Sequence, residues 1–296
     1  MRVAFTSDLH TDSSVLNQEA VAELVRLARE SRPDCLVVAG DVSADPEELE
    51  RYLAAFAAVD VPRIFVPGNH DVWLHPRGDR AVPGNSTSKY DRLIARRARQ
   101  AGFHPVWRSP AIVADTAFVG TDGWYDYSFA PETLRLGPAD YARKEYGGLA
   151  WQDRHFARWK PRASDPSADE CLSDTEVADM LNDDLRKLLA RVSRRRAVSR
   201  IVAVTHHLPF RQMVRYHNNP RWDYFCAFMG NEKMGCLIES FDKVTHVLAG
   251  HTHVRMDLRV GRLRCLTSPL GYLARKREPL DEEIRKALTL IELDEP

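Results

Sequence analysis

Residues 35–71 read CLVVAGDVSADPEELERYLAAFAAVDVPRIFVPGNHD, and this stretch decides the fold. The apolar run Cys35–Ala39 predicts a buried strand, and Ile64–Val66 predicts another. Between them, Pro46–Ala57 predicts a helix, because Asp45 can cap its first turn and two glutamates suit its positive end. A strand, a helix and a second strand in this order indicate parallel strands in a layered α/β sheet.

The same alternation extends on both sides of this stretch. Val3–Thr6 predicts an earlier strand, and Asn17–Arg29 predicts a helix with apolar residues at helical spacing. Further strands are predicted at Ile112–Val119, Arg200–Val204, Val244–Leu248, Arg255–Val260, Arg264–Thr267 and Ala287–Leu293. Because the late strands follow one another without helices, we expect antiparallel pairing in the second half and a mixed sheet.

The pattern changes between Gly123 and about Val198. This segment is rich in aromatic residues, and it holds a polar loop at Pro161–Ser173 before a helix from about Asp174 to Val192. We interpret residues 123–198 as a helical, aromatic-rich insertion within one domain of residues 1–296. Such an insertion is a possible substrate cap.

Composition narrows the class of protein and of partner. The formal net charge of the 296 residues is +0, so the overall balance gives no reason to expect nucleic acid as a partner. The five cysteines are scattered without C-x-x-C spacing, which is typical of a reducing compartment. No apolar stretch approaches the roughly 20 residues that cross a bilayer. We therefore expect a cytoplasmic protein that has no membrane partner.

Five short blocks of Asp, His and Asn carry the candidate chemistry. Each block follows a strand-like run, and the edge where parallel strands end is where α/β sheets place their sites. The blocks are Asp8-Leu9-His10, Gly40-Asp41, Gly68-Asn69-His70-Asp71, Thr205-His206-His207 and Gly250-His251-Thr252-His253. We expect them to meet at one edge.

The composition of these blocks suits two metal ions held close together. Two cations repel each other, so an anionic ligand must bridge them, and Asp41 on its Gly-Asp turn is the candidate. The other side chains offer carboxylate, imidazole and amide donors: Asp8, His10, Asn69, His206, His251 and His253. A mixed set of nitrogen and oxygen donors suits manganese, iron, zinc or cobalt better than calcium or copper.

D-x-H, G-D, G-N-H-D, a strand-end His and G-H-x-H, in this order, resemble the motifs of the calcineurin-like metallophosphoesterases. The resemblance implies a four-layer α/β/β/α sandwich and two divalent or trivalent metal ions, Mn²⁺ or an Fe/Zn pair. It implies that Asp8, His10, Asp41 and His253 hold one metal, and that Asp41, Asn69, His206 and His251 hold the other. His70 would be the catalytic residue that acts on the phosphate.

One position departs from the phosphoprotein phosphatases of this family. Those enzymes have an Asp three residues after the bridging Asp, where this chain has Ala44. The departure argues against a protein phosphatase and favours the bacterial small-molecule and cyclic-nucleotide branches. It leaves open whether Asp45, Asp71 or neither of them orients His70.

The predicted function is hydrolysis of a phosphomonoester or phosphodiester by water activated between the two metals. The substrate is expected to be a small molecule or a nucleotide. A metal-dependent nuclease is the alternative, and a non-catalytic scaffold on the same fold is a third hypothesis. Oligomeric state is not readable from the sequence.

Several further residues are candidates for the substrate site or for support of the metal ligands. The Arg211–Phe225 segment leaves the strand-end His206 and could form a substrate wall. For Asp71 and His207 we favour a supporting role, although His207 is also an alternative ligand. The full set is Asp45, Asp71, His75, Trp124, Tyr125, His207, Arg215, His217 and Arg221. The arginine runs at 92–99 and 191–200 are interpreted as surface.

Overall fold

The structure is a computed structural model, and it describes residues 1–74, 84–162, 170–276 and 278–293. The first of its two large sheets has the order β13-β1-β2-β3-β4. The strands are β1 (Arg2–Thr6), β2 (Cys35–Ala39), β3 (Arg63–Val66), β4 (His104–Pro105) and β13 (Thr289–Glu292). All neighbours are parallel except β13, which runs antiparallel to β1 at the edge.

The second sheet has the order β11-β12-β10-β9-β6-β5. The strands are β5 (Ala111–Val113), β6 (Thr116–Thr121), β9 (Arg200–Thr205), β10 (Val244–Ala249), β11 (Met256–Val260) and β12 (Leu263–Thr267). The four inner strands are parallel, and the two edge strands are antiparallel to their neighbours. The expected antiparallel pairing of the late strands is thus limited to the edges.

The prediction of a single strand at Ile112–Val119 is wrong, because this stretch forms two strands. The chain turns back at Ala114, whose φ of 52° lies in the left-handed region, and forms the antiparallel pair β5 and β6. The sequence AIVADTAFV holds only a short polar interruption, so its apolar character masks the turn. The fold gains an edge strand from it.

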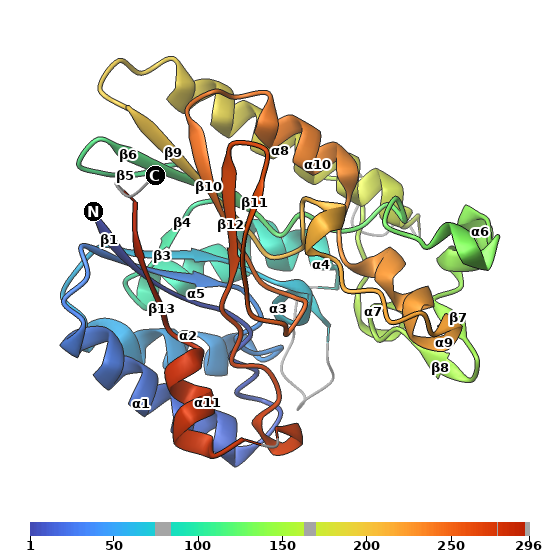
Figure 1. Ribbon diagram of the computed structural model, residues 1–296, viewed down its shortest axis with the longest axis horizontal. Coiled ribbons are helices and arrows are strands. Elements are labelled where there is room, and N and C mark those ends of the chain that lie inside the picture. Colours follow the sequence, from blue (N-terminus) through green and yellow to red (C-terminus); the bar gives the residue numbers. More distant parts are fainter. Residues whose placement is uncertain (75–83, 163–169, 277, 294–296) are drawn as a thin grey trace.

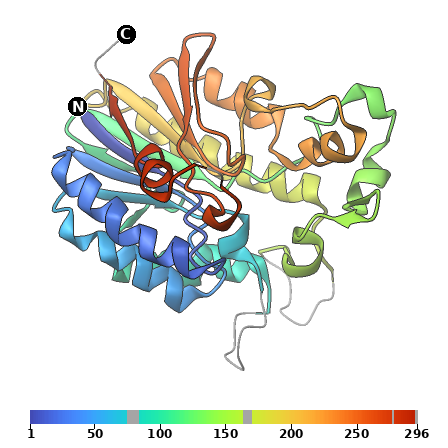
Figure 2. The same ribbon diagram turned by 60° about the horizontal axis from the view of Figure 1, so that its bottom comes forward.

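Helices cover the outer faces of both sheets (Figure 1 and Figure 2). The outer face of the first sheet carries α1 (Val15–Glu30), α2 (Pro46–Ala55) and α5 (Ala95–Gln100), and α8 (Asp174–Ser193) and α10 (Glu232–Glu239) cover the second. Between the sheets lies an apolar layer to which both contribute, such as Val37 from β2 and Val204 from β9. The four-layer α/β/β/α sandwich is therefore confirmed.

The remaining elements are short. The helical segments are α3 (Asn69–Val72), α4 (Ser86–Ser88), α6 (Pro138–Ala142), α7 (Asp153–Phe156), α9 (Pro220–Asp223), α11 (Leu280–Lys286), the π-helix Lys89–Ile94 and the 3₁₀ turns Phe56–Ala58, Glu132–Leu134, Arg211–Met213, Tyr224–Phe228 and Leu273–Arg275. A small hairpin joins β7 (Glu145–Tyr146) and β8 (Leu149–Ala150). Within the described residues, no helix combines the length and apolar character needed to span a membrane.

The segment that we interpreted as an insertion has two different parts. Helix α8 packs Leu185 and Leu189 against Ala117 and Val119 of β6, so it is a covering helix of the sandwich. It crosses between the parallel strands β6 and β9, as such helices do. The part before it, with α6, α7, β7 and β8, extends beside the two sheets (Figure 1). Only that earlier part is placed as an addition to the sandwich.

A glycine in β6 sets the spacing of the two sheets. A Cβ atom added at Gly120 would meet Val66 Cγ1, and would lie 2.6 Å from the carbonyl oxygen of Val204 and 2.9 Å from Val106 Cγ2. These neighbours are backbone or buried side chains, so they have little room to move.

Gly120→Ala is therefore expected to lower the free energy of unfolding by about 1–3 kcal/mol, because overpacking strains a closed core. Urea denaturation followed by circular dichroism measures the change. Gly84→Ala is the matched control, since an added Cβ there meets nothing within 4 Å. Equal stability of both variants and the natural protein would contradict the close packing described at Gly120.

Candidate metal centre

The predicted site residues meet where the parallel strands of both sheets end. Asp8 and His10 follow β1, Asp41 follows β2, and Asn69 begins α3 after β3. The second sheet contributes three imidazoles, with His206 after β9 and His251 and His253 after β10. The two sheets therefore share one site across the edge of the sandwich.

Two groups of donor atoms form there, and they have one member in common. Asp8, His10, Asp41 and His253 make up the first group, and Asp41, His206 and His251 make up the second. Within each group the donor atoms all lie within 4.8 Å of one another. Asn69 adds its amide oxygen to the second group, 3.2 Å from His206 Nε2 and 3.1 Å from His251 Nδ1.

The backbone at these residues is strained. Five of the seven candidate ligands have positive φ angles: Asp8 (54°), His10 (44°), Asp41 (56°), His251 (70°) and His253 (52°). Non-glycine residues in this region cost of order 1–3 kcal/mol each, and they persist where the surrounding structure enforces them. The left-handed turns bring side chains that would leave the strand on different sides toward a common point.

Three glycines close around the imidazole of His206. A Cβ atom added at Gly40, Gly68 or Gly250 would lie 2.5, 2.6 and 2.9 Å, respectively, from the nearest atom of that ring. Each glycine belongs to a different sequence block, G-D, G-N-H-D and G-H-T-H. The glycines of these blocks are thus required by the close approach of the loops to His206.

The charge states of the buried donors fit metal binding. Burial, with the neighbouring charges of His70 and His253, holds the pKa of His10 well below its ordinary value, and burial does the same at His251. These two imidazoles are therefore neutral and have a lone pair to donate. Burial alone would raise the pKa of Asp41, but the surrounding histidines, His206 foremost, lower it well below its ordinary value.

Two further contacts call for a cation. His10 Nε2 lies 2.8 Å from His253 Nε2, so a proton or a cation must offset the repulsion of their lone pairs. Although burial lowers the pKa of His206, the charge of Asp41 raises it to about 10, which means that the site attracts positive charge. Carboxylate, imidazole and amide donors of this kind fit a pair of divalent metal ions.

Two of the buried imidazoles, those of His206 and His251, turn their outward-facing nitrogen toward a backbone carbonyl. His206 Nδ1 lies 2.9 Å from the carbonyl oxygen of Ala39, and His251 Nε2 lies 3.2 Å from that of Phe228. An N–H group donated to each carbonyl leaves Nδ1 of His251 as an acceptor toward the site, and Nε2 of His206 would become one when a metal ion displaces its proton. Such outer contacts fix the tautomer and the ring orientation of metal-ligating histidines.

Neither candidate carboxylate orients the ring of His70 in the described structure. Asp45 caps α2 by accepting from the N–H groups of Glu47 and Glu48, at 2.7 and 3.1 Å. Asp71 accepts four backbone N–H groups, from Asp41, Val42, Ser43 and Gly68, at 2.8–3.0 Å. Burial raises the pKa of Asp71 to about 7. Asp71 therefore joins the loop of Asp41 to the loop of His70.

His70 is held by its backbone and by an aromatic neighbour. Its N–H group donates to Asp41 Oδ1 at 2.9 Å, and its ring stacks on the indole of Trp73 with centroids 3.6 Å apart. The ring also meets His10 edge-on at 4.6 Å, and its Nε2 lies 4.0 Å from Asp41 Oδ2. The ring is partly exposed and lines the cavity beside the metal centre.

Asp153 supports the site, although no sequence pattern pointed to it. Its side chain is buried, and Oδ1 accepts from Asn69 Nδ2 at 2.9 Å and from Trp73 Nε1 at 2.6 Å. Oδ2 accepts from Trp151 Nε1 at 2.7 Å and from the hydroxyl of Tyr125 at 3.0 Å. The bond to Asn69 turns its amide so that the oxygen faces the metal centre.

The other candidates divide into supporting and exposed residues. His207 is buried behind the site, with Nδ1 2.9 Å from Asp122 Oδ1 and its ring 4.2 Å from that of His251. Trp124 is also buried and donates to Asp174. Arg215 and His217 line the cavity beside the metal centre, whereas Arg221 does not. His75 lies outside the described residues.

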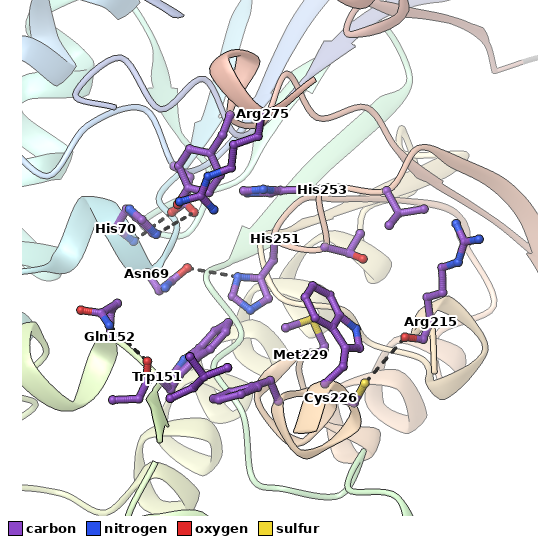
Figure 3. Close-up of a pocket in the computed structure, with 18 of the residues that line it drawn as sticks. Asn69, His70, Trp151, Gln152, Arg215, Cys226, Met229, His251, His253 and Arg275 are labelled. Atoms are coloured by element: carbon purple, nitrogen blue, oxygen red, sulfur yellow. Dashed lines mark hydrogen bonds and ion pairs between the residues drawn. The ribbon is translucent and has the colours of Figure 1, made fainter. Parts of the chain in front are cut away.

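The cavity itself has a volume of about 530 Å³, and Figure 3 shows its lining. In Figure 3, His70 and Arg215 lie on opposite sides of the lining, with His251 between them. Lining residues that the sequence did not identify are Trp73, Leu149, Ala150, Trp151, Gln152, Cys226, Met229, Val254, Tyr272, Arg275 and Lys276. They come from segments with no motif, and only the fold brings them to the site.

A family model described as calcineurin-like phosphoesterase matches residues 1–255. The [acyl-carrier-protein] phosphodiesterase PptH of Mycobacterium tuberculosis is 33% identical over 135 residues, which are 43% of this chain and 38% of PptH. The alignment thus spans well under half of that curated relative.

Solved structures extend the similarity to the whole chain. The phosphopantetheinyl hydrolase PptH of M. tuberculosis superposes with a TM-score of 0.73 at 22% identity, covering 99% of this chain and 96% of PptH. A dimetal phosphatase from Danio rerio gives a TM-score of 0.51 at 16% identity, covering 90% and 86%. These structures show the fold, and the match to the family model shows the family membership. The chain belongs to the calcineurin-like phosphoesterase family.

Proposed function

We propose that the chain hydrolyses a phosphodiester of small-molecule size with a pair of metal ions held at the candidate centre. The observation that carries the proposal is the shared carboxylate of Asp41, which belongs to both groups of donor atoms. A dinuclear site needs such a bridge, and the family to which the chain belongs has metal-dependent phosphoesterase chemistry.

We assign the ligands as the sequence blocks suggested. Asp8, His10, Asp41 and His253 would hold one ion, and Asp41, Asn69, His206 and His251 would hold the other. When bound, the ions would polarise the phosphoryl group and acidify a water molecule. Manganese or an iron and zinc pair suits these donors.

His70 is the proposed acid for the leaving group. Its ring is partly exposed and lines the cavity, and Nε2 approaches Asp41 Oδ2 only to 4.0 Å, so the ring can meet the substrate. Stacking on Trp73 fixes the plane of the ring, and the backbone bond to Asp41 fixes its distance from the bridge. From there, His70 can donate a proton to the ester oxygen or stabilise charge on the phosphoryl group.

Asp153 is the proposed positioning residue for this arrangement. One carboxylate accepts hydrogen bonds from the ligand Asn69 and from Trp73, on which His70 stacks. It also holds Trp151, which lines the cavity. Asp153 would thus couple the metal ligand, the catalytic ring and the substrate wall through direct contacts.

The substrate class is inferred from the cavity and from the relatives. The described cavity is enclosed by Trp151 of the added segment and by the loop of Arg215, which supports the cap role proposed for the part of residues 123–198 before α8. Relatives are named for acyl-carrier-protein and phosphopantetheinyl substrates. We therefore propose a phosphodiester, and a phosphopantetheinyl diester is the first natural candidate to test.

The proposed activity is tested with bis(p-nitrophenyl) phosphate and p-nitrophenyl phosphate after chelation and reloading with Mn²⁺, Fe²⁺ or Zn²⁺. We expect chelation to abolish hydrolysis and one of the metals to restore it. Asp41→Asn should lose both bound metal and activity, because the bridging charge is reduced; metal analysis by mass spectrometry measures the first. Hydrolysis that survives complete metal removal would contradict the proposal.

His70→Ala gives the contrasting outcome. The variant should keep its bound metal and lose about 10²–10⁴-fold in kcat, which is the usual contribution of general acid catalysis. Metal content and rates are measured on the same preparation. If His70→Ala loses the metal together with activity, His70 is a ligand and not the proposed acid.

Asp153→Asn is expected to weaken metal binding or lower kcat by about 10- to 100-fold, as changes to groups that orient metal ligands do. The amide has one acceptor oxygen in place of two, so either Asn69 and Trp73 or Trp151 and Tyr125 lose their acceptor. Tyr125→Phe removes a single donor to the same carboxylate and is the matched control, with a smaller effect. Metal titration and steady-state kinetics separate the two effects, and an Asp153→Asn enzyme equal to the control would refute the role.

A further inference from the structure

The cavity is larger than a phosphoryl group requires. Its volume of about 530 Å³ lies in the range of pockets that enclose drug-sized ligands. The end beside His70, His251 and His253 is the metal centre, and Figure 3 shows Arg215 at the opposite side of the lining. The space between these ends must accommodate part of the substrate that does not react.

This intervening wall is apolar. We call Leu149, Trp151, Trp222, Phe225 and Met229 the apolar arm, and all five line the cavity. Leu149 and Trp222 are 44% and 58% exposed, although large apolar side chains are usually covered. Exposed apolar groups that gather at a cavity mark a place where a ligand covers them.

The shape of the arm favours a slender chain over a nucleobase. Trp151 already stacks on Phe228 with centroids 5.4 Å apart and planes 16° apart, and it lies nearly parallel to Phe225 at 6.0 Å. Its indole and the ring of His251 form a T-shaped contact, with centroids 5.7 Å apart and an angle of 74° between the rings. A base that stacked on Trp151 would have to displace these rings, whereas a chain of methylene groups packs against ring edges and against the exposed Trp222 alike.

The charges of the lining residues exclude a substrate whose non-reacting ester group is cationic. Among the described lining residues, Asp41 at the metal centre is the one carboxylate, and Arg215, Arg275 and Lys276 are cationic. Lys276 is paired with Glu283 at 3.5 Å, whereas Arg215 has no ion pair within the described residues. A quaternary ammonium group, which aromatic walls otherwise attract, would meet net positive charge here.

We propose that the apolar arm binds the ester group of the substrate that is not cleaved. This group is an extended, mainly apolar chain that is neutral or anionic. The inference rests on the proposed phosphodiesterase function and adds the residues that select the substrate. Contact with Trp222 and Phe225 favours substrates with a long alkyl chain over those with a short one, because each buried methylene adds free energy of binding.

A series of p-nitrophenyl alkyl phosphodiesters with methyl, propyl and hexyl groups tests this. We expect kcat/KM to rise with chain length, by up to about fourfold for each fully buried methylene and by at least about tenfold from methyl to hexyl. The decisive quantity is the ratio of kcat/KM for hexyl to that for methyl. It is unaffected by the fraction of enzyme that is loaded with metal.

Substitutions in the apolar arm test whether its residues cause the hexyl-to-methyl ratio of kcat/KM. Phe225→Ala and Trp222→Ala should each lower the hexyl-to-methyl ratio by about tenfold, since truncation removes most of an aromatic contact surface. Ile112→Ala on β5 is the matched control: Ile112 is also large and 42% exposed, but does not line the cavity, and its ratio should equal that of the natural protein.

Two substrates of equal shape and different charge test the predicted exclusion of cationic ester groups. The choline ester of p-nitrophenyl phosphate should be hydrolysed with a kcat/KM at least about tenfold below that of its neutral 3,3-dimethylbutyl isostere. The proposed subsite would be overturned if the methyl ester is hydrolysed and kcat/KM for the hexyl ester is no higher. A preference for choline or nucleoside esters would also overturn it. If no ester, the methyl ester included, is hydrolysed with any metal, the proposed phosphodiesterase function itself has failed.

Discussion

The imidazole of His206 sets the geometry on which the site depends. Its ring lies between three loops from both sheets, and each loop has a glycine at which an added Cβ atom would meet the ring: Gly40, Gly68 and Gly250. Any side chain at these positions would push the loops apart, and the donor atoms that now lie within 4.8 Å of one another would separate. Close packing between the two sheets is therefore a precondition of metal binding.

The same crowding explains where strain is stored. Asp41 adopts a left-handed turn with φ of 56°, and three backbone N–H groups of its loop donate to Asp71, which also accepts from the N–H group of Gly68. A buried carboxylate that satisfies four donors is costly to lose, so it can keep an unfavourable backbone in place. The strain orients Asp41 toward both groups of donors, and a bound cation would offset part of its cost.

The segment outside the sandwich is tied to the metal centre by one residue. Asp153 accepts hydrogen bonds from Asn69 in the core and from Trp151 in the wall of the cavity. The substrate wall therefore has a fixed position relative to the metal ligands, although the chain between them is long.

The sequence by itself determined the family, the layered fold and the seven candidate ligands, because strand periodicity and short motifs at strand ends are local signals. It also marked Arg215 and His217, which follow directly from the ligand loop. The turn at Ala114 and the covering role of α8 were not predicted, since an apolar pattern does not reveal where a strand reverses or which face a helix covers. The Arg211–Phe225 segment, with Trp222 and Phe225 of the apolar arm, was also predicted as a substrate wall. Only the tertiary structure placed Asp153, Trp73, Leu149, Trp151 and Met229, because their contacts join segments far apart in the chain. Distances across a fold depend on packing, and packing leaves no motif in the sequence.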